Sequence, residues 1–135
     1  MTEVDTVAIS YGDALTQPFW EAARHHRLII QRCTKCGNYQ FYPRPFCLQC
    51  QSNDLGWVDA MGTGEVYSVT TVRMDVLPEL PPPYQVAIIQ LDEGPRMLAG
   101  LAGNQSNIGD RVTLTWRERE DLPPLPMFSV EGIHP

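Results

Sequence analysis

Residues 33–50 begin with Cys33-Thr34-Lys35-Cys36 and end, after ten intervening residues, with Cys47-Leu48-Gln49-Cys50. The chain has 4 cysteines, and these two brackets contain all of them. Two Cys-x-x-Cys pairs can surround one tetrahedral zinc ion, because each pair turns tightly and the ten-residue arm can fold back. A disulfide framework or unpaired buried thiols are the alternatives, and the opening of the sequence, which has no features of a secretory segment, favours zinc. We therefore predict one structural zinc per chain.

The donor set also limits the chemistry of the chain. Four thiolates fill a tetrahedral coordination sphere, so the predicted ion has no open position at which to activate water. With every cysteine committed to metal, no free thiol is left as an acyl-accepting nucleophile. We predict no catalytic residue in this chain.

Length and composition indicate one small folded protein. A chain of 135 residues buries about two-thirds of its unfolded surface, enough for one modest core and a metal-stapled module. Its apolar runs are shorter than the roughly 20 residues that cross a bilayer, so we expect no membrane association. The acidic start Met1-Thr2-Glu3-Val4-Asp5 is unlike a signal peptide, which predicts a reducing cytoplasm.

The first half of the chain contains the signals for a short helix and a zinc ribbon. Residues 1–17 have little periodicity and are predicted to form an N-terminal arm. Pro18 suits the first turn of a helix that continues through His26. Residues 28–32 and 39–42 then read as paired strands around the first bracket, so that helix and ribbon occupy 18–60. Gly37 directly follows the first bracket and suits a left-handed turn, whereas Gln51 at the corresponding place predicts a second knuckle that is either looser or more strained.

The second half, 61–135, has the pattern of an all-β domain. Strands are predicted at 65–72, 84–91, 96–101, 111–116 and 127–130, separated by glycine- and proline-rich turns. Five such strands can close a small barrel and are too few for an immunoglobulin-type sandwich. An OB-type barrel is favoured, although an SH3-like barrel also fits the strand count.

Several motifs together resemble the DUF35 family. They are Pro18-Phe19-Trp20-Glu21-Ala22, Leu28-Ile29-Ile30-Gln31-Arg32-Cys33, Phe41-Tyr42-Pro43-Arg44-Pro45, Gly64-Glu65-Val66-Tyr67-Ser68-Val69-Thr70 and Leu91-Asp92-Glu93-Gly94-Pro95-Arg96. The resemblance covers roughly residues 18–131. It implies a mainly β protein with a short N-terminal helix, in which a rubredoxin-like zinc ribbon precedes a five-stranded OB-fold barrel.

The same resemblance implies a supporting role in acyl-CoA metabolism. Members of the family accompany thiolase-fold enzymes, including thiolases, acyltransferases and retro-aldolases, or are joined to MaoC-like hydratases. The partner carries the chemistry, and the small subunit braces it and helps to accommodate the CoA thioester. We expect a heteromeric complex, with two copies of each chain, because thiolase-fold enzymes are commonly dimers.

Aromatic residues around the ribbon are the predicted contacts to a partner or to acyl-CoA. A small ribbon cannot bury so many large side chains in its own interior, so part of the set must cover the barrel or face outward. Cementing the ribbon to the barrel is the alternative role for any one of them. The set is Phe19, Trp20, Tyr39, Phe41, Tyr42 and Phe46.

Two other functions fit the sequence less well. A ribbon with an OB barrel can bind single-stranded nucleic acid, but residues 61–135 have ten acidic and five basic side chains, which opposes phosphate binding. The net charge of −6 becomes about −8 when four thiolates (−4) and one Zn²⁺ (+2) are added. A self-sufficient enzyme acting on CoA esters is the other alternative, but the sequence contains no recognisable activated arrangement.

Overall fold

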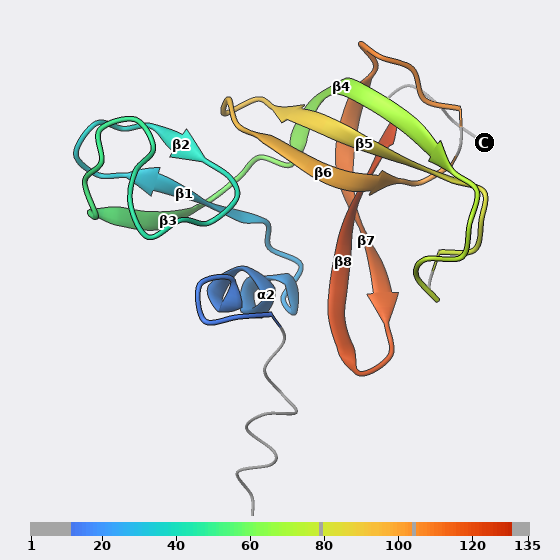
Figure 1. The fold of residues 1–135 in the computed structure, drawn as a ribbon, viewed down its shortest axis with the longest axis horizontal. Helices are drawn as coiled ribbons and strands as arrows, with labels where there is room; N and C mark the ends of the chain where they lie inside the picture. The colour runs from blue at the N-terminus through green and yellow to red at the C-terminus, as the bar shows by residue number, and fades with distance from the viewer. Residues whose placement is uncertain (1–11, 79, 104, 131–135) are drawn as a thin grey trace, which may run out of the picture.

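The computed structural model describes residues 12–78, 80–103 and 105–130. Figure 1 shows a small three-stranded sheet on one side, a closed five-stranded barrel on the other, and the short helix α2 (Gln17–Ala23). The predicted fold class is confirmed: the described chain is mostly β with one short helix. Within these residues, no helix has the length and apolarity needed to cross a bilayer.

Helix α2 begins where the sequence indicates but ends earlier. Pro18 lies in its first turn, and Phe19, Ala22 and Ala23 are its buried residues. The predicted continuation to His26 is wrong, because Arg24 caps the helix and His26 takes a left-handed φ of 59°. Residues 1–11 of the predicted N-terminal arm lie outside the described residues.

The ribbon sheet contains the predicted pair of strands and one more. Strands β1 (Ile29–Cys33) and β2 (Tyr39–Gln40) are antiparallel. On the other side of β1 lies β3 (Leu55–Asp59), which was not predicted; Gly56 interrupts its strand-forming residues and weakens the signal. The sheet order is β2-β1-β3.

The barrel has the order β4-β5-β6-β8-β7, with β4 also pairing with β7 to close it. Its strands are β4 (Thr63–Val72), β5 (Tyr84–Leu91), β6 (Arg96–Leu101), β7 (Arg111–Arg119) and β8 (Leu122–Val130). All neighbours are antiparallel except β6 and β8, which are parallel and pair only at Gly100–Met127 and Leu101–Phe128. This closed five-stranded order is that of an OB-fold.

Strand β8 is longer than predicted. The sequence indicated 127–130, because proline cannot donate to a strand ladder, yet the strand starts at Leu122 and includes Pro123, Pro124 and Pro126. The physical reason is the pairing: residues 122–126 pair with β7 alone, so this stretch has one neighbouring strand and tolerates missing N–H groups.

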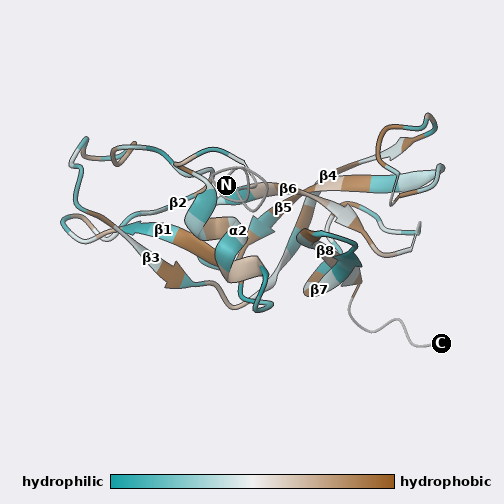
Figure 2. Ribbon diagram, turned by 90° about the horizontal axis from the view of Figure 1, so that it is seen from below, coloured by the Kyte–Doolittle hydropathy of each residue, from teal (hydrophilic) through white to brown (hydrophobic). Residues whose placement is uncertain are grey.

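One hydrophobic core joins the two halves. Val66, Ile89 and Phe128 of the barrel are fully buried in the same cluster as Phe19 of α2 and Ile30 of β1. Both views place α2 between the three-stranded sheet and the barrel (Figure 1 and Figure 2). The helix therefore packs against both β1 of the ribbon and β8 of the barrel and holds the two halves together.

Candidate metal centre and apolar cleft

The structure brings the four predicted ligands together. All four Sγ atoms lie within 4.8 Å of one another, and two pairs, Cys33–Cys50 and Cys36–Cys47, are 3.6 Å apart. A tetrahedral zinc ion with Zn–S bonds of about 2.3 Å needs sulfurs about 3.8 Å apart. The cage therefore has the size and the donor set for a structural zinc ion.

Backbone amides turn toward the sulfurs in the same way in both brackets. The N–H groups of Lys35 and Cys36 donate to Cys33 Sγ at 3.4 Å. In the second bracket, those of Gln49 and Cys50 donate to Cys47 Sγ at 3.3 and 3.5 Å. These donors stabilise thiolate charge, so the two knuckles are near-equivalent halves of one cage.

The residue after each bracket adopts a left-handed backbone conformation. Gly37 has φ +82° and Gln51 has φ +67°, and the amide of each donates to the carbonyl of the first cysteine in its bracket at 2.8 Å. Glycine reaches this region without cost, whereas a residue with a Cβ does not. The second knuckle thus has a strained backbone, which is one of the two alternatives that the sequence left open.

The sulfur pKa values show why the cage suits a cation. The Cys50 amide, opposed by burial and helped by the Gln49 amide, lowers the pKa of Cys47 to about 6, and the Cys36 amide similarly lowers that of Cys33. For Cys36, the Asn38 amide acts to lower the pKa, but burial and the neighbouring sulfurs outweigh it and raise the value to about 12. Four adjacent thiols cannot all ionise alone; a bound cation would stabilise all four as thiolates.

A buried pair of glutamines holds the arm between the brackets, and the sequence analysis did not identify it. Gln40 donates to Gln31 Oε1 at 2.9 Å and to the Phe46 carbonyl at 3.2 Å, and accepts from the Leu48 amide at 3.0 Å. Gln31 in turn binds both the amide and the carbonyl of Arg44. These amides fix the second knuckle relative to β1 and β2.

An apolar cleft of about 410 Å³ lies where helix, ribbon arm and barrel meet. Phe19 and Trp20 of α2 and Phe41 and Tyr42 of the arm line it, so four of the six predicted contact residues come together. The opposite wall is formed by residues 97–100 of β6, with contributions from β5 and β8. Leu98, on this wall, is 55% exposed.

The other two predicted contact residues lie elsewhere. Tyr39 is half-buried, with the Arg32 guanidinium 4.7 Å above its ring. Phe46 is 45% exposed and borders an open groove that also contains Cys50. The predicted set is therefore divided among the cleft, strand β2 and the groove beside the second knuckle, and a linear sequence gives no means of making that division.

Polar and aromatic contacts, one at the cleft and the others outside it, join the helix–ribbon half to the barrel. The Leu98 amide donates to the Tyr42 hydroxyl at 3.3 Å. His26, just beyond α2, is 2.5 Å from Glu118 and stacks on Trp116 of β7 with ring centroids 5.6 Å apart. These ties were not predicted, because each joins residues far apart in the sequence.

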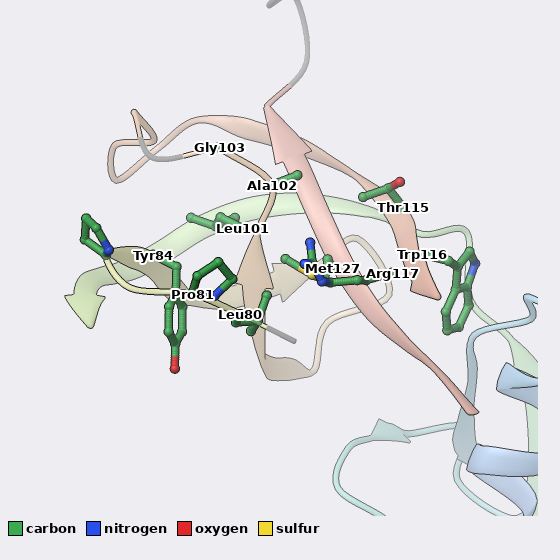
Figure 3. Close-up of a pocket in the computed structure, with 11 residues that line it drawn as sticks. Leu80, Pro81, Tyr84, Leu101, Ala102, Gly103, Thr115, Trp116, Arg117 and Met127 are labelled. Carbon is green, nitrogen blue, oxygen red and sulfur yellow. The ribbon is translucent and has the colours of Figure 1, made fainter. Parts of the chain in front are cut away.

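A second groove of about 440 Å³ shares Leu80 and Tyr84 with the cleft. Figure 3 shows Pro81 and Tyr84 at one end of it and Trp116 at the other. Residues of the proline-rich loop before β5 thus line both hollows.

The carboxylates of Asp92 and Glu93, in the turn between β5 and β6, each bind other groups of the chain. Asp92 receives two hydrogen bonds from Arg111, at 2.8 and 2.9 Å, and one from the Thr63 hydroxyl at 2.5 Å. The hydrogen bonds from Arg111, then that from Thr63, lower the pKa of Asp92 to about 2. Glu93 instead accepts from the Met61 amide at 2.7 Å. The two side chains are engaged separately and form no acid–base pair.

Comparison with known proteins agrees with both halves of the fold. A family model described as the rubredoxin-like zinc ribbon domain of ChsH2 matches residues 20–56, and one described as the C-terminal OB-fold domain of ChsH2 matches residues 57–117. This match favours the OB-fold over the SH3-like alternative.

Three relatives are informative. A "probable enoyl-CoA hydratase alpha subunit" from Thermomonospora curvata is 41% identical over 114 residues, which is 82% of this chain and 36% of the relative. A "DUF35 domain-containing scaffold protein" from Methanothermobacter thermautotrophicus is 30% identical over 70% of this chain and 75% of its own length. A solved structure titled "Ltp2-ChsH2(DUF35) aldolase" superposes with a TM-score of 0.80 at 36% identity, covering 88% of this chain and 96% of that one.

A cysteine cage on a three-stranded ribbon, wedged by one helix against an OB barrel, defines a zinc-ribbon–OB-fold protein. With the relatives above, the chain belongs to the DUF35 family. It spans only about a third of the hydratase subunit it matches, 36% of that protein's length.

Proposed function

We propose that this chain is a non-catalytic, zinc-stabilised accessory subunit of an acyl-CoA-metabolising complex. It braces a thiolase-fold enzyme, such as a thiolase, acyltransferase or retro-aldolase, or a MaoC-like hydratase, and helps to accommodate the CoA thioester. We expect the complex to form in the cytoplasm with two copies of each chain. The partner supplies the reacting groups.

The observation that carries the proposal is the match to the DUF35 chain of an aldolase. It extends over 96% of that chain with a TM-score of 0.80 and 36% identity, so ribbon and barrel correspond together. Other relatives are named as a hydratase subunit and as scaffold proteins. These names describe members of multi-chain assemblies and support an accessory role here.

The chemistry of the described residues is consistent with that role. The four cysteines form one cage, Asp92 is paired with Arg111, and His26 with Glu118. None of these groups lines the apolar cleft. A cleft walled by aromatic and aliphatic side chains can bury apolar groups, but it offers little with which to move a proton.

The cleft is the proposed contact for the partner or the acyl-CoA. Phe19, Trp20, Phe41 and Tyr42 line one side, and the exposed Leu98 lines the other. Rigid aromatic side chains around a concave apolar site are typical of binding hot spots. We propose that Tyr39 and Phe46 contribute through the ribbon, Phe46 directly and Tyr39 by supporting the sheet.

The surface of the barrel disfavours the nucleic-acid alternative. Val86 and Leu98, which line the cleft from β5 and β6, are apolar, whereas the groove of a nucleic-acid-binding OB-fold combines basic residues with stacking aromatics. Arg96 lies over the Tyr67 ring at 3.7 Å from its centroid, so the cation is already stacked within the chain. We expect no shift of a labelled single-stranded oligonucleotide.

Two assays test the proposal. The purified chain is assayed alone for thiolysis, hydration and retro-aldol cleavage of acyl-CoA esters, and we expect no turnover. A tagged chain is then isolated from its native cells, and we expect a thiolase-like or hydratase-like protein in near-equal amount. Robust turnover by the chain alone, or recovery of ribosomes and nucleic-acid enzymes, would refute the accessory role.

A pair of variants tests the cleft. Leu98→Glu places a charge on the cleft wall, whereas Ile108→Glu makes the same change at a 69%-exposed residue outside it. We expect Leu98→Glu to abolish recovery of the partner and Ile108→Glu to leave it unchanged. Equal recovery with both variants would show that the cleft is not the contact.

A further inference from the structure

All four sulfurs of the cage lie within 4.8 Å of one another, and two of the contacts between them cross from one bracket to the other. Cys33 Sγ lies 3.6 Å from Cys50 Sγ, and Cys36 Sγ lies 3.6 Å from Cys47 Sγ. Cys33 and Cys47 are buried, whereas Cys36 and Cys50 are exposed. Each contact therefore joins one cysteine that a small reagent in solution can reach to one that is shielded from it.

We propose that the cage is also an oxidation site, at which hydrogen peroxide converts the four cysteines into two disulfides, Cys33–Cys50 and Cys36–Cys47, and releases the metal. The proposal is independent of the partner enzyme. It assigns a covalent modification to residues whose first role is to bind zinc.

The exposed sulfur of each contact is the point of attack. Its thiolate attacks one peroxide oxygen, the O–O bond breaks, hydroxide leaves and a sulfenic acid forms. The buried sulfur of the same contact then attacks the sulfenic sulfur, so that the S–S bond forms and a second hydroxide leaves. Each disulfide thus passes two electrons to one peroxide, which takes up two protons and becomes two waters. Two peroxides oxidise the cage, and zinc leaves as Zn²⁺ because disulfide sulfur is a poor ligand.

The geometry favours attack at Cys50. This residue lines an open groove of about 870 Å³ together with Lys35 and Phe46, so peroxide has a direct route to its sulfur. A disulfide bond is about 2.05 Å long, and each 3.6 Å contact must therefore close by about 1.5 Å. Removal of the ion from between the sulfurs allows that closure.

The crossing of the contacts determines what happens to the fold. The bonded cysteines are 17 and 11 residues apart in the sequence, so each disulfide ties one knuckle to the other, as the metal does. Bonds within the brackets, Cys33–Cys36 and Cys47–Cys50, would leave the knuckles unconnected after metal loss. The cross-bracket form keeps the ribbon closed, and oxidation is then reversible by a thiol reductant and zinc.

The experiment uses the zinc-loaded full chain titrated with hydrogen peroxide. Zinc release is followed with a metallochromic dye, and the product is digested with trypsin and chymotrypsin without reduction, which places each cysteine in a separate peptide for mass spectrometry. We expect two peroxides consumed per zinc released and linked peptides for Cys33–Cys50 and Cys36–Cys47. Linkages within a bracket or between chains, or retained zinc with free thiols, would overturn the proposal.

A matched control separates oxidation from metal loss. Chelator in the presence of reductant removes zinc and leaves four thiols, whereas peroxide removes zinc and leaves two disulfides. We expect limited proteolysis to cut the arm 37–46 rapidly in the chelated protein and at least tenfold more slowly in the oxidised one. Equal cleavage rates would refute retention of the ribbon, whichever disulfides are found.

Discussion

The two knuckles of the cage differ at one backbone position, and that difference predicts opposite effects of two substitutions. Gly37 and Gln51 occupy equivalent places, both with left-handed φ, of +82° and +67°. Gly37→Ala introduces a Cβ into that conformation, and Gln51→Gly removes one. We expect the first to weaken zinc binding and the second to strengthen it, because closure of the cage is coupled to folding of the ribbon.

The size of the expected change in folding free energy follows from the backbone conformation alone. A Cβ at Gly37 meets only Arg32 Nη2, at 3.6 Å, which is an ordinary contact, so no steric clash adds to the cost. Left-handed backbone costs a non-glycine residue about 1–2 kcal/mol, and the extra freedom of glycine in the unfolded chain offsets about 0.5–1 kcal/mol of this. The net change is about 1 kcal/mol of destabilisation for Gly37→Ala. Gln51→Gly should gain about 0.5–1 kcal/mol by the same balance.

Competition with a zinc chelator measures both effects. A change of about 1 kcal/mol alters the apparent zinc dissociation constant about fivefold. Gly37→Ala should therefore release zinc at about fivefold lower chelator activity, and Gln51→Gly should require more chelator than the wild type. An unchanged dissociation constant for Gly37→Ala, or weaker binding by Gln51→Gly, would refute the assignment of strain to these two positions.

Three further predictions concern the cage, its supporting amides and the hairpin. Cys50→Ser removes one of four ligands, so we expect loss of zinc, an unfolded ribbon and loss of the partner complex; unaltered zinc content would contradict this. Gln40→Ala leaves the Phe46 carbonyl and the Leu48 amide without their buried partner and should lower the free energy of unfolding in urea by about 2–3 kcal/mol, whereas the exposed Gln49→Ala should change it little. Because the pKa of Asp92 is lowered to about 2 in the fold, its charge stabilises the protein above about pH 4, and this contribution is lost as the pH falls through 2. The carboxyl is 30% exposed, so Asp92→Asn should cost about 1 kcal/mol at pH 6 and less at pH 3, and an equal cost at both would argue against the ion pair.

Local signals predicted much of the fold. Strands β5 and β6 were predicted with their observed bounds. The nearly continuous apolar run of β5 and the turn at Gly94 that leads into β6 are both visible in the sequence itself. The cage was predictable for the same reason, since each bracket is one short turn. Helix α2 was predicted too long, because the residues up to His26 have helical propensity but the chain must turn there to enter β1.

Features that depend on distant residues were not predictable. The cleft combines α2, the arm after β2 and strand β6. The contacts from Tyr42 to Leu98 and from His26 to Glu118 join residues 56 and 92 positions apart in the sequence. The proline-containing start of β8 is a strand only because β7 lies beside it. Gln40 looks like an ordinary polar residue until the fold buries it beside Gln31.

The parallel seam between β6 and β8 is only two residue pairs long, whereas β5 and β6 pair over five. On heating or in hydrogen–deuterium exchange, the barrel should open first between β6 and β8, because so few residue pairs join these two strands. Residues 97–100 on one side and Leu125 on the other both border the apolar cleft. A molecule bound in the cleft would contact both β6 and β8 and hold the two strands together. Tighter binding in the cleft should therefore make the barrel more resistant to opening.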